Sequence, residues 1–533
     1  MRLRFISITP VLLFIFLVLH VKSFSQQPDL ILINGKIFTS DTTQRYVQAL
    51  AIKGNKIIAV GSNVFIEKTA SSKTKRIDLA GKTVVPGFND AHDHLAWPSP
   101  ITQSFITEFA VPGPTKKEVI DSLSRLVKRA SPGQWIQGTI GLTVFNDTNF
   151  RRKLLDSISP NNPVALNIMW GHGMIINSKA LKAIKVTDTD ADPLGGWYER
   201  TPGTKYITGA LYEYAQFPVW QALAIIEPAK MVKALQAHAQ EEMELGITTV
   251  QNMNSLLRGN AAKRIYKEAQ LPVRTRIISM PGTTAKGRDL ADWNNNENWS
   301  NSLSYISGIK YVIDGTPLEQ TALKTKPYPD KNNWYGRLDF PVDSIKQILK
   351  EALTSNRQLM LHIVGDSATK IVLDLMKQMA TPEQWKQKRV RIEHGSGITT
   401  AASINDVKRL GIIIVNTPSS KKKPLHTWID AGIPVAIGPD GLINPYLNIM
   451  SMSAQQTDPN QNITVEQAVM AYTKGSAYAE FAEKKKGTLM PGMLADLAVL
   501  SQDIFSIPKD QLPKTKSVLT LIDGKIVYQQ IHK

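Results

Sequence analysis

The chain has 533 residues, of which 42% are hydrophobic and 20% charged, so it is long enough to form a large globular core. It contains no cysteine, which excludes disulfides, thiolate metal sites and a cysteine nucleophile. The formal net charge is +18, but the lysines are dispersed, and the triplets 421–423 and 484–486 have no interleaved aromatic residues. We therefore expect solvated basic faces and no binding to nucleic acid.

The first 25 residues have the composition of a signal peptide. Arg2 and Arg4 precede the apolar run 11–19, and the small residues Ser23 and Ser25 precede a cleavage site before Gln26. We expect export across the inner membrane to a bacterial periplasm. A retained membrane anchor is the alternative, although the apolar run is short for a span. No second long apolar run follows, so the mature chain is expected to be soluble and free of the membrane.

Both ends of the mature chain are rich in short strands and tight turns. Residues 29–38 and 47–60 contain Asn-Gly and Gly-Asn turns, and residues 518–528 form a hairpin pattern around Asp523-Gly524. Each end is too small to bury a core by itself. We therefore predict that residues 26–85 and 487–533 pair into one small β-sandwich domain.

The middle of the chain, residues 86–486, alternates strand-like and helical segments, which is typical of parallel β/α units. Polar residues gather at the ends of the strand-like runs, and this favours a (β/α)8 TIM-like barrel over an open sheet. More than eight strand candidates occur, so the exact count stays open. They are residues 83–86 with the segment that follows, 135–139, 164–169, 248–251, 273–278, 308–313, 358–363, 390–394, 411–415 and 433–437. Helical patterns cover residues 229–245, 342–355, 368–379 and 404–410.

Histidines at strand ends indicate a metal site. His92 and His94 are separated by one residue, so on an extended strand both imidazoles point to the same side. His362 and His394 end later strand-like runs, and Asp440 follows the last one. Two incidental histidines at a polar strand end are the alternative for His92 and His94 alone. The five residues together predict a divalent-metal centre at the mouth of the barrel.

Eight motifs together resemble the amidohydrolase superfamily, and more narrowly its YtcJ-like (amidohydrolase 3) branch, which includes N-substituted formamide deformylases. The resemblance spans nearly the whole mature chain and implies a metal-dependent hydrolase barrel with one or two divalent ions, expected to be zinc. The motifs lie at residues 86–94, 163–172, 208–213, 309–315, 362–366, 391–394, 438–440 and 491–496.

The resemblance also implies roles for single residues. His92 and His94 would hold one ion and His362 and His394 the other, while Asp440 would serve both as a metal ligand and as a proton shuttle. A second ion requires a bridging anion, since two bare cations repel strongly.

Three further residues have open roles. Lys310 occupies the place where related enzymes carry a carboxylated lysine, and Glu213 is the competing candidate for the bridge. An unmodified Lys310 and a single-metal site remain the alternatives. His172 is expected to contact the substrate or to stabilise the developing oxyanion.

We therefore expect an exported amidohydrolase that cleaves a carbon–nitrogen bond, in a non-peptide or cyclic amide of a small molecule, by metal-activated water. Two alternatives stay open: a catalytically relict metal-binding protein with a periplasmic binding or regulatory role, and a deaminase on the same scaffold. The expected partner is a small-molecule amide. The sequence leaves open whether the chain forms a homo-oligomer.

Overall fold

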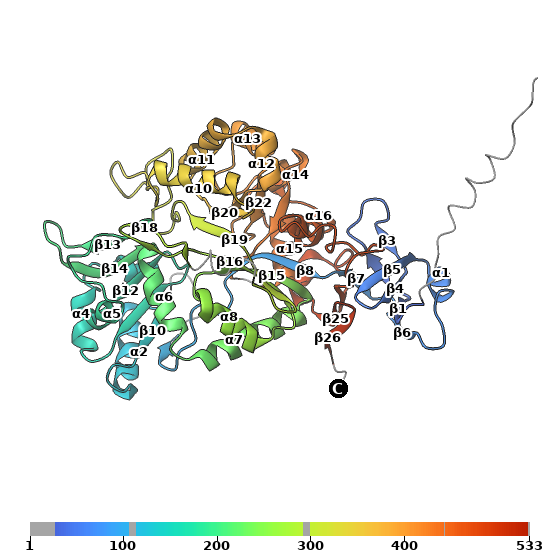
Figure 1. Cartoon of the computed structure of the whole chain (residues 1–533), viewed down its shortest axis with the longest axis horizontal. Helices are drawn as coiled ribbons and strands as arrows, with labels where there is room; N and C mark the ends of the chain where they lie inside the picture. The colour runs from blue at the N-terminus through green and yellow to red at the C-terminus, as the bar shows by residue number, and fades with distance from the viewer. Residues whose placement is uncertain (1–26, 106–112, 292–298, 442, 531–533) are drawn as a thin grey trace, which may run out of the picture.

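The computed structural model describes residues 27–105, 113–291, 299–441 and 443–530; the predicted signal peptide lies outside these ranges. Its centre is a nearly closed barrel of eight parallel strands, as predicted (Figure 1). In order around the barrel the strands are β8 (Phe88–Asp93), β15 (Ile247–Asn254), β16 (Arg274–Ser279), β19 (Ser304–Val312), β20 (Leu359–His362), β21 (Arg391–His394), β22 (Ile413–Asn416) and β23 (Val435–Ile437).

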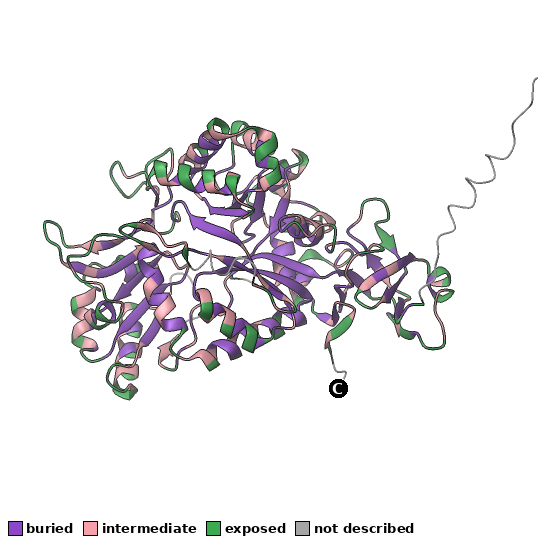
Figure 2. Cartoon of the chain, in the orientation of Figure 1, coloured by how far each residue is buried: buried purple, intermediate pink, exposed green. Residues whose placement is uncertain are grey.

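Helices cover the outside of the barrel, with their exposed faces toward solvent and the strands buried beneath them (Figure 2). The four predicted helices are all present, and local sequence explains their ends. Helix α7 has Pro228 in its first turn, where the missing N–H costs no hydrogen bond. Helix α13 begins with a capping box between Thr400 and Ser403 and ends at Gly411, whose φ of 66° suits glycine. The helices are α7 (Pro228–Glu244), α10 (Val342–Thr354), α11 (Asp366–Met379) and α13 (Ala401–Leu410).

A second sheet is inserted between the first two barrel strands, and it corrects the predicted strand list. Residues 135–139 and 164–169 do contain strands, but these strands belong to a six-stranded sheet outside the barrel. Both are buried along their whole length, and such apolar runs do not reveal which sheet a strand joins. The inserted sheet consists of β13 (Gly196–Arg200), β14 (Ile207–Glu213), β12 (Gly173–Ile176), β11 (Val164–Ile168), β10 (Ile136–Ile140) and β9 (Ser104–Phe105).

The two ends of the described chain meet in one sheet, as expected from their hairpins. Its order is β26 (Lys525–Gln529), β25 (Ser517–Ile522), β24 (Leu497–Leu500), β7 (Thr83–Pro86), β2 (Lys36–Phe38) and β3 (Tyr46–Val47). Buried apolar side chains of this sheet and of a four-stranded sheet form one hydrophobic cluster. The order of the four-stranded sheet is β5 (Lys56–Gly61), β4 (Ala49–Lys53), β1 (Leu30–Ile33) and β6 (Lys75–Asp78). The sandwich architecture and the domain boundaries stay predictions.

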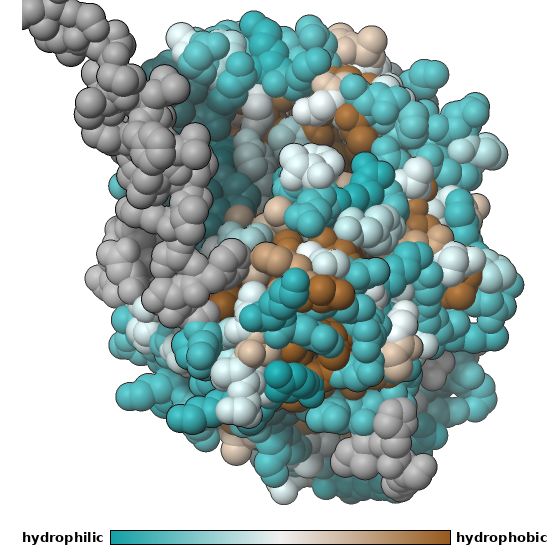
Figure 3. Space-filling model, turned by 90° about the vertical axis from the view of Figure 1, so that its right-hand side faces the viewer, coloured by the Kyte–Doolittle hydropathy of each residue, from teal (hydrophilic) through white to brown (hydrophobic). Residues whose placement is uncertain are grey.

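The face of the molecule that bears the terminal sheets is mostly polar, with small apolar patches between hydrophilic side chains (Figure 3). Among the described residues, no helix combines the length and the apolar character needed to cross a membrane.

A glycine lets the last barrel strand approach the first. The Asp440 N–H donates to the His92 carbonyl at 3.1 Å, which joins the segment after β23 to β8. A Cβ atom added at Gly438 would lie 2.2 Å from the Cβ of His92. A side chain at this position would therefore push apart the strand that carries a predicted metal ligand and the turn that carries Asp440.

Replacing Gly438 with alanine should destabilise the protein by about 3 kcal/mol, because the added methyl group meets a backbone-anchored atom in a packed seam. Urea denaturation of the wild type and the variant measures the change. Gly61→Ala is the control: its added Cβ would meet only the exposed ring of Phe65, which can move, so its midpoint should stay close to wild type. Equal midpoints for the two variants would contradict the packing argument.

Candidate metal centre

His92 and His94 lie at the carboxyl end of β8, and both ring nitrogens Nε2 approach the same carboxylate. His92 Nε2 is 3.6 Å and His94 Nε2 is 3.5 Å from Asp440 Oδ1. His92 Nδ1 donates to the Glu393 carboxylate at 2.6 Å, so its Nε2 lone pair is turned toward the barrel mouth. The Nζ atom of Lys310 lies 2.9 Å from that same Nε2. The predicted pair of imidazoles therefore points to one place.

The second pair of histidines comes from the neighbouring strands β20 and β21. His394 Nε2 and His362 Nδ1 are 2.9 Å apart, and His394 Nδ1 lies 2.8 Å from the Thr417 hydroxyl. His362 Nε2 is buried and has no hydrogen-bond partner among the described residues. The ring of His92 lies 5.1 Å from that of His394, so the two pairs form one cluster.

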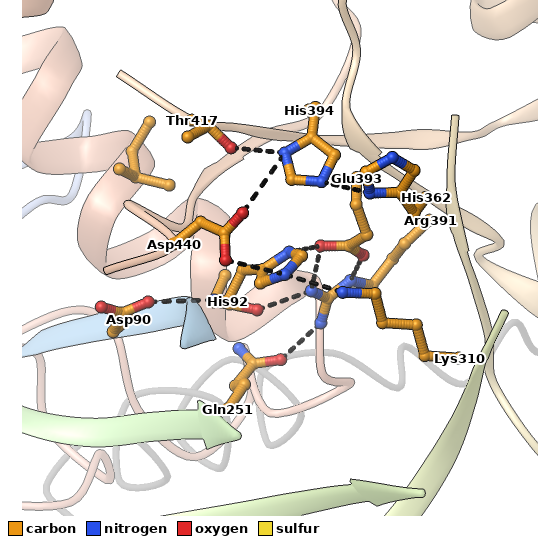
Figure 4. Close-up of polar contacts among 12 residues, drawn as sticks. Asp90, His92, Gln251, Lys310, His362, Arg391, Glu393, His394, Thr417 and Asp440 are labelled. Carbon is orange, nitrogen blue, oxygen red and sulfur yellow. Dashed lines mark hydrogen bonds and ion pairs between the residues drawn. The ribbon is translucent and has the colours of Figure 1, made fainter. Parts of the chain in front are cut away.

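A buried ion pair fixes the orientation of His92 (Figure 4). Arg391 binds both oxygens of Glu393, with Nε at 2.9 Å from Oε1 and Nη2 at 3.0 Å from Oε2. The same guanidinium donates to Gln251 Oε1 and to the Ala91 carbonyl, each at 2.6 Å. Because Arg391 and Glu393 are fully buried, the arginine neutralises a carboxylate that is also held against His92.

Asp440 is held over this cluster by an unusual backbone conformation. Its φ is 57°, in the left-handed region that non-glycine residues rarely adopt. The turn directs Oδ1 toward His92 and His94 and Oδ2 to within 4.0 Å of His394 Nδ1. Burial raises the pKa of Asp440, against the opposing charges of Lys310 and His172. A carboxylate with a raised pKa is a better proton acceptor near neutral pH.

Lys310 enters the cluster from strand β19. Its side chain is 2% exposed, and burial lowers the pKa of Lys310 to about 8, although the charges of Asp440 and Glu393 oppose this shift. A buried amine of lowered pKa is neutral more often than an exposed lysine, and chemical modification of the nitrogen requires the neutral form.

His172 and Glu213 come from the inserted sheet, not from the barrel. His172 Nδ1 lies 2.9 Å and 3.0 Å from the two oxygens of Glu213, and its ring is 4.9 Å from that of His362. Glu213 thus contacts His172, whereas Lys310 contacts His92. Burial, with the charges of Glu319 and Asp314, raises the pKa of Glu213 well above its usual range.

The residues present fit a divalent metal. Nitrogen atoms of His92 and His94 and an oxygen of Asp440 lie within 4.8 Å of one another. Burial lowers the pKa of His94 to about 3, and it also lowers the pKa of the other clustered histidines, so the imidazoles are neutral and can offer lone pairs. His362 Nε2 is buried without a hydrogen-bond partner among the described residues, so its lone pair is available to a metal ion.

Sequence reasoning missed the residues that support the ligands, namely Arg391, Glu393, Gln251 and Thr417. A signal for two of them was present: Arg391 and Glu393 stand two residues apart on a short strand, so their side chains lie on the same face. Charged side chains are rarely fully buried unless they are paired. Gln251 and Thr417 carry no such signal, because their partners are distant in the chain.

Comparison with known proteins agrees with the geometry. The model of the amidohydrolase family matches residues 75–528. The Arabidopsis thaliana protein LONG AFTER FAR-RED 3 is 28% identical over 94% of this chain and 91% of its own length. An N-substituted formamide deformylase of Arthrobacter pascens is 24% identical, covering 95% of this chain and 99% of its own. An uncharacterized metal-dependent hydrolase of Pyrococcus horikoshii shares the fold, with a TM-score of 0.67 at 22% identity over 90% of this chain and 99% of its own.

Replacing Glu393 with glutamine should weaken metal binding about 10- to 100-fold, because His92 loses the carboxylate that orients it. The change also leaves the Arg391 charge buried and unmatched, which should cost about 3 kcal/mol of stability. Competition with a chelator measures the first effect and urea denaturation the second.

The control is Glu483→Gln, which breaks an Arg–Glu pair at 2.8 Å near the surface, between Glu483 and Arg389. That variant should bind metal like the wild type and lose less than about 1 kcal/mol. Unchanged metal affinity in the Glu393 variant would show that the ion pair does not position His92.

Proposed function

The chain belongs to the amidohydrolase family and is a metal-dependent hydrolase acting on carbon–nitrogen bonds; we propose that its substrate is a small amide and that Asp440 transfers the proton. The observation that carries this proposal is the convergence of four imidazoles, one lysine and one carboxylate at the carboxyl ends of the barrel strands. Figure 4 shows this group except for His94. Barrel enzymes place their reacting groups at that end.

The ligand assignment follows from the contacts. His92 and His94, with Asp440, would hold one divalent cation, and the adjoining His362 and His394 would hold the second. We propose zinc, because neutral imidazoles and carboxylates suit it. Bound here, such a cation would polarise the amide carbonyl and make water a stronger acid.

Asp440 is placed to move the proton. Its side chain is 31% exposed, so water and substrate can reach a carboxylate that otherwise faces the histidine cluster. The carboxylate accepts a proton from the attacking water and delivers it to the amide nitrogen as the carbon–nitrogen bond breaks. The raised pKa of Asp440 makes its carboxylate a stronger base than that of an ordinary aspartate, which helps it accept the proton.

His172 is placed to donate a hydrogen bond to the substrate oxygen. The raised pKa of Glu213 favours its protonated form, and donation from that form to His172 Nδ1 would leave the ring proton of neutral His172 on Nε2. Burial keeps the imidazole neutral by lowering the pKa of His172. An N–H group held in this way can stabilise negative charge that develops on the carbonyl oxygen.

We also propose Lys310, carboxylated on Nζ, as the bridging anion, in preference to Glu213. The support is positional: Lys310 Nζ lies 2.9 Å from His92 Nε2, whereas Glu213 contacts His172. Carboxylation would turn a buried cation into an anion between two cations, which removes their mutual repulsion.

Residues 1–25 support a proposal of export to the periplasm, where the substrate would be met outside the cytoplasm. The relative named as a formamide deformylase makes N-substituted formamides the first amides to test.

Asp440→Asn should lower kcat at least about 100-fold on any amide that the metal-loaded wild type hydrolyses, because the amide side chain cannot accept the proton. Release of the product amine from a panel headed by N-substituted formamides measures the rate. Asp430→Asn, on the surface beside His426, is the control and should keep wild-type activity. Near-normal turnover by the Asp440 variant would exclude the proton transfer, and no hydrolysis of any panel member by the wild type would favour the regulatory alternative.

Lys310 should give a carbamate signal in a ¹³C NMR spectrum after exchange with ¹³C-bicarbonate, because only a neutral amine reacts with carbon dioxide. Lys310→Gln should abolish the signal. Lys423→Gln is the matched control, since Lys423 is 3% exposed and burial lowers its pKa to about 7. A signal lost with Lys423 instead would place the modification there, and the absence of any signal would favour the single-metal form.

A further inference from the structure

A second group of histidine and carboxylate side chains lies on the face of strand β8 opposite to His92 and His94. Successive side chains of a strand point to opposite faces, so Asp93 points away from the face that His92 and His94 share. It meets helix α7, on which His238 and Glu242 stand one turn apart. This group is separate from the centre at the barrel mouth, and the proposed mechanism does not use it.

The three side chains converge on one point. His238 Nε2 lies 2.9 Å from Asp93 Oδ2 and 3.4 Å from Glu242 Oε1, and the three atoms fall within 4.8 Å of one another. Ligand atoms that each bind one ion at about 2.1 Å are about 3 to 3.5 Å apart. The two distances from His238 Nε2 are therefore close to those between ligands of a single cation, and the two carboxylates need only a small shift to bind the same ion.

Hydrogen bonding does not account for the arrangement. Asp93 is 1% and Glu242 0% exposed. Yet His238 Nε2, Asp93 Oδ2 and both Glu242 oxygens have no hydrogen-bond partner of acceptable geometry among the described residues. Both carboxylates approach the same ring nitrogen, which can carry only one proton. Buried polar atoms without such bonds are uncommon, and a bound ion is one of the partners that can satisfy them.

The charges around His238 also favour a bound cation. Asp90 lies close enough to interact electrostatically with Asp93, Glu242 and His238, and its Oδ2 is also buried without a hydrogen bond. Three carboxylates thus surround one imidazole. Burial, with a smaller contribution from the charge of Asp93, raises the pKa of Glu242 to about 7, against the opposing effect of His238. A divalent cation would supply the missing charge.

We propose that Asp93, His238 and Glu242 bind a divalent cation, such as zinc or manganese, at a structural site between β8 and α7. One imidazole and two carboxylates suit either ion. The partial exposure of His238, 21% of its side chain, gives the ion a route from solvent. The bound cation would hold α7 against β8 at Asp93, which lies between His92 and His94 in the sequence.

Metal analysis of the full chain and diffraction together test the proposal. After dialysis in zinc, the wild type should contain one more equivalent per chain than His238→Asn or Glu242→Gln. The control is His426→Asn. His426 forms an exposed pair with Asp430 at 3.0 Å and four residues apart, the same sequence spacing as His238 and Glu242, but with no third ligand. This variant should contain as much zinc as the wild type.

Anomalous scattering at the zinc edge, from crystals of the zinc-loaded wild type, should show a peak between Asp93, His238 and Glu242 in addition to density at the barrel mouth. Density at the barrel mouth alone would overturn the proposal and leave an ion triad with a protonated His238, for which the charges of Asp93 and Glu242, against burial, raise the pKa to about 11. Because the two locations are observed separately, failure of this site is distinguishable from failure of the catalytic centre.

Discussion

The buried contact between Arg391, Glu393 and His92 is the interaction on which the site depends. A carboxylate inside a barrel is costly unless it is paired, and Arg391 supplies two hydrogen bonds and the matching charge. Once paired, Glu393 can hold His92 Nδ1 and so turn Nε2 toward the barrel mouth. Lys310 Nζ and Asp440 Oδ1 both lie close to that nitrogen. The orientation of one ring therefore depends on charges on a strand three hundred residues away in the sequence.

The barrel and the inserted sheet contribute different groups to the same cluster of side chains. The barrel provides the clustered ligands at the ends of its parallel strands, where they are fixed by the ladder and by packing. The inserted sheet provides His172 and Glu213, and this pair lies against His362 without belonging to the barrel. The two sets of side chains therefore come from different sheets and meet only through tertiary packing.

Strand β8 presents clustered polar side chains on both of its faces. One face presents His92 and His94, and the other presents Asp93 to His238 on α7. Its start is also constrained, because a Cβ at Gly87, between β7 and β8, would overlap Thr248 of the neighbouring strand. Attachment at both faces and at its start restricts the positions of His92 and His94, as a preformed metal site would require.

The sequence by itself determined the kinds of elements and the chemistry. The period of apolar residues predicted the barrel strands from residue 248 onward and the four helices, and the spacing of His92 and His94 predicted a shared direction. The local pattern could not assign residues 135–139 and 164–169 to a separate sheet, because a fully buried strand has the same apolar sequence in the barrel and in the inserted sheet. Tertiary structure alone joined Glu393 to His92, Lys310 to the same nitrogen, and Asp93 to His238. The physical reason is that periodicity and turn chemistry act between near neighbours in the chain, whereas the pairing of buried charges is set by which strands fold side by side.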